Sequence, residues 1–216
     1  MKPIKAFIIN RNLLSTLKHT VEFLQRNDKI EVWILDQNST YPPLLDYYST
    51  NPCNIYYCKA NIGHLAYWSV QELHDDNYFI VCDPDCTYNG IPDDWLDVML
   101  SVLNDTTVFK VGFSIDVSNL PPTTLGKHQK EYQQIFWKDK NKYGWIADID
   151  TTFALYRPNS QFGYSAIRLD VPYTMQHYPW YIIEDNITEE WMYYLSNVEK
   201  SSTCKSYLNE IKLAHN

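Results

Sequence analysis

The chain opens with a short apolar run, a cluster of polar residues and then apolar positions at helical spacing. The run Ile4–Ile9 ends at Asn10-Arg11-Asn12, and the apolar residues that follow are Leu13, Leu14, Leu17, Val21 and Leu24. A β-branched run of this length is typical of a buried strand, and the spacing after it is that of an amphipathic helix. The pattern therefore predicts a strand, a polar loop and a helix in succession.

Similar runs recur before the middle of the chain. Three further strands are predicted, each ending in polar residues: Val32–Leu35 before Asp36-Gln37-Asn38-Ser39, Ile55–Cys58 before Asn61-Ile62-Gly63-His64, and Tyr78–Val81 before Asp83-Pro84-Asp85. Helices are expected after the first two, from Pro42-Pro43 and over Leu65–Leu73. Strands alternating with helices predict a mainly parallel sheet flanked by helices, which binds ligands at the carboxyl edge of its strands.

The second half of the chain continues the alternation. A helix begins near Pro92, with acidic residues in its first turn and one apolar face of Trp95, Val98, Met99, Val102 and Leu103. Further elements are expected as a strand over Phe109–Ile115, a helix over Lys127–Trp137, strand character over Trp145–Tyr156, a helix over Glu189–Leu195 and a helical tail from Ser201. No linker or internal repeat interrupts the pattern, so we expect a single α/β domain over residues 1–216.

Charge and length limit the classes of partner. The 216 residues carry a net charge of −8, and Lys and Arg are scattered, so the chain has no basic surface expected to bind nucleic acid. No apolar stretch approaches the ~18 residues that cross a bilayer, and we expect no membrane insertion. No anchor or separate acceptor domain is recognisable, and the chain is expected to be one part of a longer multidomain polypeptide.

Cysteine usage indicates a reducing compartment. The five cysteines include no Cys-x-x-Cys pair and comprise Cys53, Cys58, Cys82, Cys86 and Cys204. An odd number without a signal-peptide pattern predicts reduced thiols in a cytoplasmic protein. We expect these thiols to be buried as small apolar side chains rather than to bind zinc.

The sharpest chemical feature is Asp83-Pro84-Asp85, directly after the strand Tyr78–Val81. Side chains one residue apart in extended chain project to the same side, so both carboxylates can approach one hard cation or its bound water. An acidic protein that binds a diphosphate needs such a cation, because its net field repels the ligand. The pattern also fits a pair of turn or helix-capping aspartates.

The polar strand ends together resemble the glycosyltransferases of the GT-A fold, a Rossmann-like α/β architecture, and are close to the family 2 type. The resemblance covers about the first half of the chain with good specificity, in Asn10-Arg11-Asn12, Val32–Ser39, Asn61–His64 and Phe79–Asp85. Further on, Asp150–Tyr156 and His177–Tyr181 resemble segments of a bacterial and viral-type subgroup. The resemblance implies a nucleotide-binding and metal-binding half over residues 1–104 and an acceptor-binding half over residues 105–216.

The same resemblance implies a site for a nucleotide-sugar donor, expected to be a UDP-sugar. Asp36 is implied to contact the base or ribose, and the loop with Asn10 and Arg11 is implied to contact the base or diphosphate. Donor contacts are also expected from Asn38, Asn61, Gly63 and Asp83. Asp36 is alternatively a turn-forming residue, and Asn61 with Gly63 alternatively forms a helix entry.

The resemblance further implies a metal ion, a catalytic carboxylate and an acceptor site. Asp83 and Asp85 are implied to bind Mn²⁺ or Mg²⁺ at the donor diphosphate, with His177 as the third ligand. Asp150, and secondarily Asp148, is expected to act as general base for inversion or to stabilise an oxocarbenium-like centre for retention. Trp180 and Tyr181 are candidates for stacking on an acceptor sugar, against plain core packing. The expected activity is transfer of a hexose or deoxyhexose to a hydroxyl group of a glycan.

Three other classes fit parts of the sequence. Asp83–Thr87 matches the Asp-x-Asp-x-Thr opening of haloacid-dehalogenase-type phosphatases, with Asp83 as nucleophile and Ser114, Lys127 or Lys130, and Asp148 with Asp150 as later motifs. That family places its nucleophile on the first core strand, whereas here three strand units come first. A nucleotidyltransferase usually begins with a Gly-rich phosphate loop, and the chain has only 6 Gly. A non-catalytic carbohydrate-binding module would account for the 18 Tyr and 7 Trp, but is typically all-β.

Overall fold

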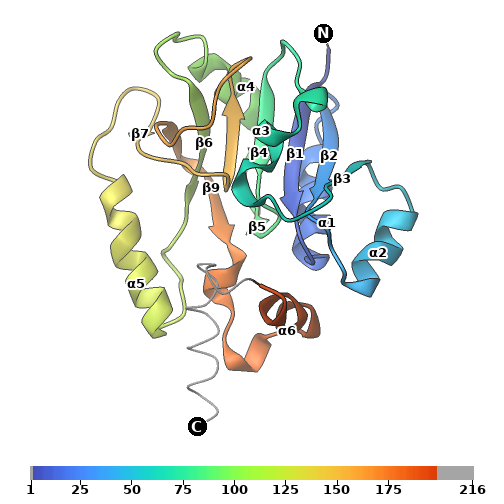
Figure 1. The fold of residues 1–216 in the computed structure, drawn as a ribbon. Coiled ribbons are helices and arrows are strands. Elements are labelled where there is room, and N and C mark those ends of the chain that lie inside the picture. The colour runs from blue at the N-terminus through green and yellow to red at the C-terminus, as the bar shows by residue number, and fades with distance from the viewer. Residues whose placement is uncertain (1, 199–216) are drawn as a thin grey trace.

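One twisted sheet organises residues 2–198, the part of the chain that the computed structural model describes (Figure 1). Its nine strands run in the order β3-β2-β1-β4-β8-β6-β9-β5, with β7 paired to β9. β1 to β4, β6 and β9 point one way, and β5, β7 and β8 point the other. The strands are β1 (Ile4–Asn10), β2 (Ile30–Asp36), β3 (Asn54–Tyr57), β4 (Phe79–Cys82), β5 (Cys86–Thr87), β6 (Lys110–Ile115), β7 (Trp145–Ile146), β8 (Phe153–Tyr156) and β9 (Ile167–His177). The prediction of a mainly parallel α/β sheet is confirmed.

Helices connect these strands and cover both faces of the sheet. The α-helices are α1 (Ser15–Gln25), α2 (Pro42–Ser49), α3 (Ala66–Ser69), α4 (Trp95–Val102), α5 (Thr124–Gln133) and α6 (Glu189–Ser196). The 3₁₀ turns are η1 (Gly63–Leu65), η2 (Gln71–Leu73), η3 (Gln134–Phe136), η4 (Tyr178–Tyr181) and η5 (Glu184–Asn186). Most of the α-helices lie within or close to the residue ranges that the sequence predicts for helices.

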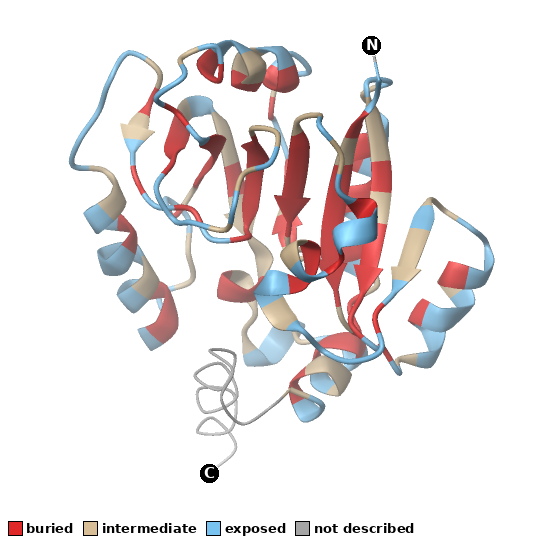
Figure 2. Ribbon diagram, turned by 45° about the horizontal axis from the view of Figure 1, so that its top comes forward, coloured by how far each residue is buried: buried red, intermediate tan, exposed pale blue. Residues whose placement is uncertain are grey.

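Alternation along the central strands divides the core between the two faces. In β1, Ile4, Ala6 and Ile8 join a cluster with α1 and α4, whereas Phe7 and Ile9 join a second cluster with α3. Successive side chains of a strand point to opposite faces, so a strand covered on both sides is apolar throughout. Figure 2 shows the central strands buried and the outer helix surfaces exposed.

Three predicted elements differ in form from the sequence-based expectation. The helix expected over Leu65–Leu73 is broken into η1, α3 and η2, and the backbone leaves the helical region at Val70, with φ −110° and ψ 74°. The helix expected over Lys127–Trp137 starts earlier, where Thr123 caps it by accepting from Gly126 N at 2.9 Å, and ends as η3. The strand character of Trp145–Tyr156 resolves into β7 and β8 with a loop between them.

β9 was not predicted at all. The apolar residues of this 11-residue strand alternate with the others, as Ile167, Leu169, Val171, Tyr173 and Met175, but the strand contains Pro172, which argues against a strand with neighbours on both sides. It pairs with β6 on one side and with β5 and β7 on the other, so its own alternation and its neighbours both favour the extended form.

The last described helix, α6, lies below the carboxyl edge of the sheet (Figure 1). Thr188 caps it by accepting a hydrogen bond from Trp191 N at 3.3 Å, and the helix expected over Glu189–Leu195 is confirmed. The helical tail expected from Ser201, together with Cys204, lies outside the described residues. Cys53, Cys58, Cys82 and Cys86 are free thiols. None of the helices within residues 2–198 has the length and apolarity required to cross a membrane.

Candidate functional site

The acidic segment after β4 lies where the sheet changes from parallel to antiparallel pairing. β4 pairs with β8, which brings the loop Asp150–Thr152 beside Asp83. Asp83 N donates to Thr152 O at 3.2 Å, and Thr151 Oγ1 donates to Asp83 Oδ2 at 3.2 Å. The structure therefore brings together Asp83 and Asp150, which the sequence had assigned to metal binding and to catalysis.

His177 reaches the same edge through strand pairing. Cys86 of β5 is opposite His177 at the end of β9, and Tyr178 N donates to Asp85 O at 2.8 Å. The imidazole Nε2 consequently lies 3.5 Å from Asp85 Oδ2, with each side chain 18% exposed. The predicted association of His177 with the acidic segment is thus present in the fold, although its role as a ligand stays a prediction.

Three carboxylates converge at this edge and repel one another. Burial raises the pKa of Asp83 well above its usual range, and the negative charges of Asp85 and Asp150 raise it further. Asp150 Oδ1 accepts from Thr152 N at 2.9 Å and also from the Thr152 hydroxyl group, which orients its carboxylate. A bound cation would offset this repulsion, because its positive charge attracts all three carboxylates.

The residues present suit a hard divalent cation whose coordination shell is completed by oxygen atoms of the substrate and of water. Asp85 Oδ1 and His177 Nδ1 are buried and have no hydrogen-bond partner among the described residues. Within residues 2–198 no three His, Cys, Asp or Glu side chains form a ready-made metal cage. Mg²⁺ commonly takes only one or two carboxylates and fills its other positions with water and substrate phosphate oxygens, and Mn²⁺ accepts similar ligands.

The loops after the first three strands form a connected surface. Gln37 N donates to Asn10 O at 2.8 Å, while Gln37 Oε1 accepts from Ile62 N at 2.7 Å. Gln37 thereby ties together the loops in which the sequence placed the donor contacts. The Gln37 side chain was not singled out from the sequence, because a glutamine within a turn sequence carries no distinctive signal.

Asp36 and Asn10 lie at the base of these loops. Asp36 is 3% exposed, and its two carboxylate oxygens accept from Ser39 N and from Tyr48 Oη, both at 3.0 Å. Asn10 is buried and donates to Tyr48 Oη at 2.9 Å and to Leu13 O at 3.0 Å. Both side chains thus brace the loops from within. Their direct contact with a nucleotide stays a prediction.

The remaining predicted donor residues lie nearer the surface. Arg11 is half-buried, and its Nε is buried without a partner among the described residues. Asn38 and Gly63 take left-handed backbone conformations, with φ of 58° and 68°, and the exposed Asn61 accepts from Gly63 N at 3.1 Å. Such turns present backbone groups to the solvent side of the edge. An unpaired guanidinium there is suited to a diphosphate.

Two buried cations support the Asp148–Asp150 segment from beneath, and the sequence reading missed both. Lys110 Nζ donates to the carbonyls of Ile149 and Gly163, and it has no carboxylate at ion-pair distance within the described residues. Arg168 donates to Asp148 O through Nε at 2.8 Å and Nη2 at 2.6 Å. The sequence does hold a signal for the burial of Lys110, because it is the only charged residue in the largely apolar run Val108–Ile115.

Burial lowers the pKa of Lys110 from 10.5 to about 8, while Asp150 and Asp148 oppose this shift. Between pH 8 and pH 10.5 the unfolded chain binds more protons at Lys110 than the folded chain does. The contribution of Lys110 to the free energy of unfolding therefore increases with pH over this range. Wild type should therefore gain about 3 kcal/mol relative to Lys110→Met over that window. Urea unfolding at several pH values measures the difference, with the exposed Lys59→Met as control. A pH-independent difference would contradict the buried charge.

The predicted acceptor residues are largely inside the protein. Trp180 is 7% exposed, and its ring lies 4.7 Å from the His177 ring. Tyr181 Oη donates to Asp116 O at 3.2 Å and to Asn119 Oδ1 at 2.9 Å. Both rings pack beside the end of β9, so little of the Trp180 surface is open to a sugar. Their acceptor role stays a prediction.

Glu190 is a further residue that the sequence reading passed over. It is buried on α6, and its carboxylate accepts from Leu14 N at 2.9 Å and from Ser15 N at 3.0 Å. Amides at the start of a helix such as α1 have no acceptor within the helix itself, and a negative charge at this end is favoured by the helix dipole. Glu190 therefore fixes α6 over the loop that carries Arg11.

Of the residues expected for a phosphatase, Asp150 lies beside Asp83, whereas Ser114, Lys127 and Lys130 have other surroundings. Ser114 is buried and donates to Leu169 O at 2.5 Å. Lys127 and Lys130 lie on α5, which Figure 1 shows at the outer edge of the second half of the sheet. Asp83 follows β4, after three strands that precede it in the same sheet.

Comparison with known proteins gives a likeness of fold. The sequence matches no protein-family model and no curated protein. Among solved structures, 4-diphosphocytidyl-2C-methyl-D-erythritol synthase from Anaerococcus prevotii is 12% identical with a TM-score of 0.43, over 72% of this chain and 70% of its own. A CMP:2-keto-3-deoxy-manno-octonic acid synthetase bound to CTP is 10% identical with a TM-score of 0.43, over 100% and 86%. The glycosyltransferase GlyE of Streptococcus pneumoniae is 10% identical with a TM-score of 0.34, over 63% and 38%. Likenesses at this level carry no inference about substrate or reaction.

Proposed function

We propose that this protein is a metal-dependent glycosyltransferase that moves a hexose or deoxyhexose from a nucleotide-sugar, a UDP-sugar by expectation, to a hydroxyl group of a glycan. The observation that carries the proposal is the convergence of Asp83, Asp85, Asp150 and His177 at the carboxyl edge of β4. Carboxylates that repel one another beside a surface of polar loops are suited to a cation that carries a diphosphate.

In this proposal Asp83, Asp85 and His177 hold Mn²⁺ or Mg²⁺, and Arg11 adds a positive charge for the diphosphate. The cation supplies electrostatic stabilisation of the departing nucleoside diphosphate. The loops joined by Gln37 orient the base and ribose. Helix α1, which follows the first of these loops, contacts the acidic segment through Thr20 Oγ1, which donates to Pro84 O at 3.3 Å.

Asp150 is the group proposed to act on the sugar or the acceptor. Thr152 orients its carboxylate, and the buried Lys110 and Arg168 are coupled to it electrostatically. Asp150 is itself exposed, so an incoming hydroxyl group can reach it. A carboxylate in this position serves either as the base that accepts the acceptor proton or as the group that stabilises positive charge on the sugar.

Thermal unfolding with UDP, GDP, CDP and dTDP, each with Mn²⁺ and with EDTA, tests the proposal. Ligand at about 100 times its Kd stabilises the folded state by ~2.7 kcal/mol, which corresponds to roughly 5–10 °C for a domain of this size. We expect such a shift with one nucleotide and Mn²⁺, and none with EDTA. Absence of a shift with every nucleotide would reject the proposed donor site.

A further inference from the structure

A cavity at the opposite end of β4 from the acidic edge has the chemistry of a sugar-binding site. It measures about 320 Å³, within the range of small-molecule pockets, and its lining includes Tyr67, Trp68, Phe79, Gln71, Ser160 and Gln161. The half-buried Trp68 offers an aromatic face, while Tyr67 and Phe79, each 3% exposed, pack in a row behind it. Amide, hydroxyl, imidazole and carboxylate groups form the remainder of the lining. This combination matches a pyranose ring, which has apolar C–H faces and a rim of hydroxyl groups.

The polar groups of the cavity are available to a ligand. The exposed side chains of Gln71 and Gln161 form no hydrogen bond to any residue from 2 to 198. Each amide offers both donors and an acceptor, as sugar hydroxyl groups require. The Trp68 indole is fixed in place, because its Nε1 donates to Ser160 O at 3.1 Å.

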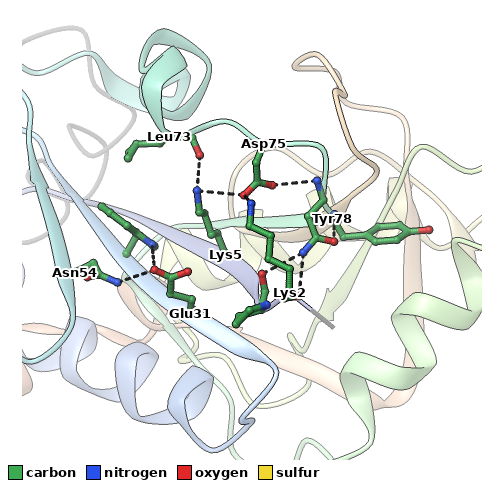
Figure 3. A network of polar contacts seen from close by, with 10 residues as sticks. Lys2, Lys5, Glu31, Asn54, Leu73, Asp75 and Tyr78 are labelled. Carbon is green, nitrogen blue, oxygen red and sulfur yellow. Dashed lines mark hydrogen bonds and ion pairs between the residues drawn. The ribbon is translucent and has the colours of Figure 1, made fainter.

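Charge at the cavity favours a neutral ligand. Asp75 lines it, but Lys2 at 2.7 Å and Lys5 at 3.2 Å neutralise this carboxylate, and Figure 3 shows both ammonium groups reaching it. Lys5 also donates to Leu73 O at 3.1 Å, which braces the connection from η2 to β4. A phosphate or carboxylate ligand would find no unpaired cation among the lining residues described.

A row of aromatic residues joins the cavity to the proposed catalytic segment. The Trp68 ring lies 5.1 Å from Phe162, which in turn lies 5.2 Å from Tyr164. Tyr164 is 54% exposed, and its carbonyl accepts from Ile149 N at 2.9 Å, directly beside Asp150. The His64 ring, from η1, also lies 5.2 Å from the Phe162 ring.

We propose that this cavity binds a neutral sugar unit of the acceptor glycan, whose chain continues over Phe162 and Tyr164 toward Asp150. The inference rests on the proposed glycosyl transfer and adds to it a remote acceptor subsite. Binding at such a subsite holds the chain in place and so raises the local concentration of the reacting end.

Ligand-observed NMR tests the subsite without nucleotide or metal, so its outcome is independent of the donor site. The probes are the methyl glycosides of glucose, galactose, mannose and N-acetylglucosamine, and the disaccharides maltose, cellobiose and lactose. We expect at least one probe to bind wild type and Asp85→Asn equally, and to bind Gln71→Ala/Gln161→Ala at least tenfold more weakly. The control Asn104→Ala/Gln134→Ala removes two exposed amides elsewhere and should bind as wild type does.

Each contrary result has a definite meaning. Binding that survives the loss of both cavity amides would place the sugar elsewhere and overturn the proposal. Binding that is lost in Asp85→Asn would place the sugar at the acidic edge and overturn it equally. Failure of every probe to bind wild type would reject a neutral sugar as the occupant, even if the nucleotide experiment succeeds.

Discussion

Asp85→Asn is expected to abolish metal-dependent nucleotide binding while the protein stays folded. The substitution keeps the shape of the side chain but removes the negative charge that the proposal places against the cation. Unit charges about 4 Å apart near a protein surface interact by ~4 kcal/mol, so the affinity for nucleotide with Mn²⁺ should fall about 10³-fold. Asp83→Asn should do the same, because its carboxylate belongs to the same repelling group.

Calorimetric titration of the nucleotide that stabilises wild type, with Mn²⁺ present, gives this affinity. The exposed Asp93→Asn is the matched control, since it removes a negative charge from the chain at a distance from the acidic edge. Circular dichroism confirms that each variant is folded. Unchanged affinity in both Asp83→Asn and Asp85→Asn would remove these residues from the donor site.

Asp150→Asn is expected to lower turnover about 10²- to 10⁴-fold while nucleotide affinity stays within a few-fold of wild type. Asparagine still accepts a hydrogen bond from Thr152 N, so the loop keeps its form. It can neither accept the acceptor proton nor stabilise positive charge on the sugar, so inversion and retention are both impaired. Release of nucleoside diphosphate from the identified donor measures the rate.

Asp148→Asn separates the two acids of this segment. The interaction of residue 148 with Arg168 runs through its backbone carbonyl, which the substitution leaves intact. A smaller loss of turnover than in Asp150→Asn is therefore expected. A full rate in Asp150→Asn, measured with the same donor, would show that the chemistry depends on another group.

Much of the first half of the fold could be predicted from local pattern. Strands such as Ile4–Asn10 are apolar on both faces because both are covered, and they end in polar residues where the chain leaves the sheet. The position of Asp83 and Asp85 at such an end followed directly. The second half was less predictable, since β9 alternates apolar and polar residues but contains Pro172, which cannot donate a hydrogen bond to a neighbouring strand and so argues against a strand in the interior of a sheet.

Roles within the site depended more on the surroundings than on residue type. Asp36 has the sequence context of a donor contact, yet both its oxygens accept hydrogen bonds within the protein. Lys110 is typical of an exposed strand position, yet it is 1% exposed and supports the Asp148–Asp150 segment. Periodicity describes one element at a time and cannot show which groups from other elements will surround a side chain.

By itself the sequence determined the alternation of strands and helices, the carboxyl edge as the place of the polar loops, and the acidic pair after the fourth strand. These features depend on residues close together in the chain, whose spacing controls which side chains share a face. Only the tertiary structure decided that His177 lies 3.5 Å from Asp85, that Asp150 lies beside Asp83, and that aromatic residues lead from Asp150 to a cavity. These contacts arise from pairing between strands that are distant in the sequence, and such pairing is set by packing of the whole sheet.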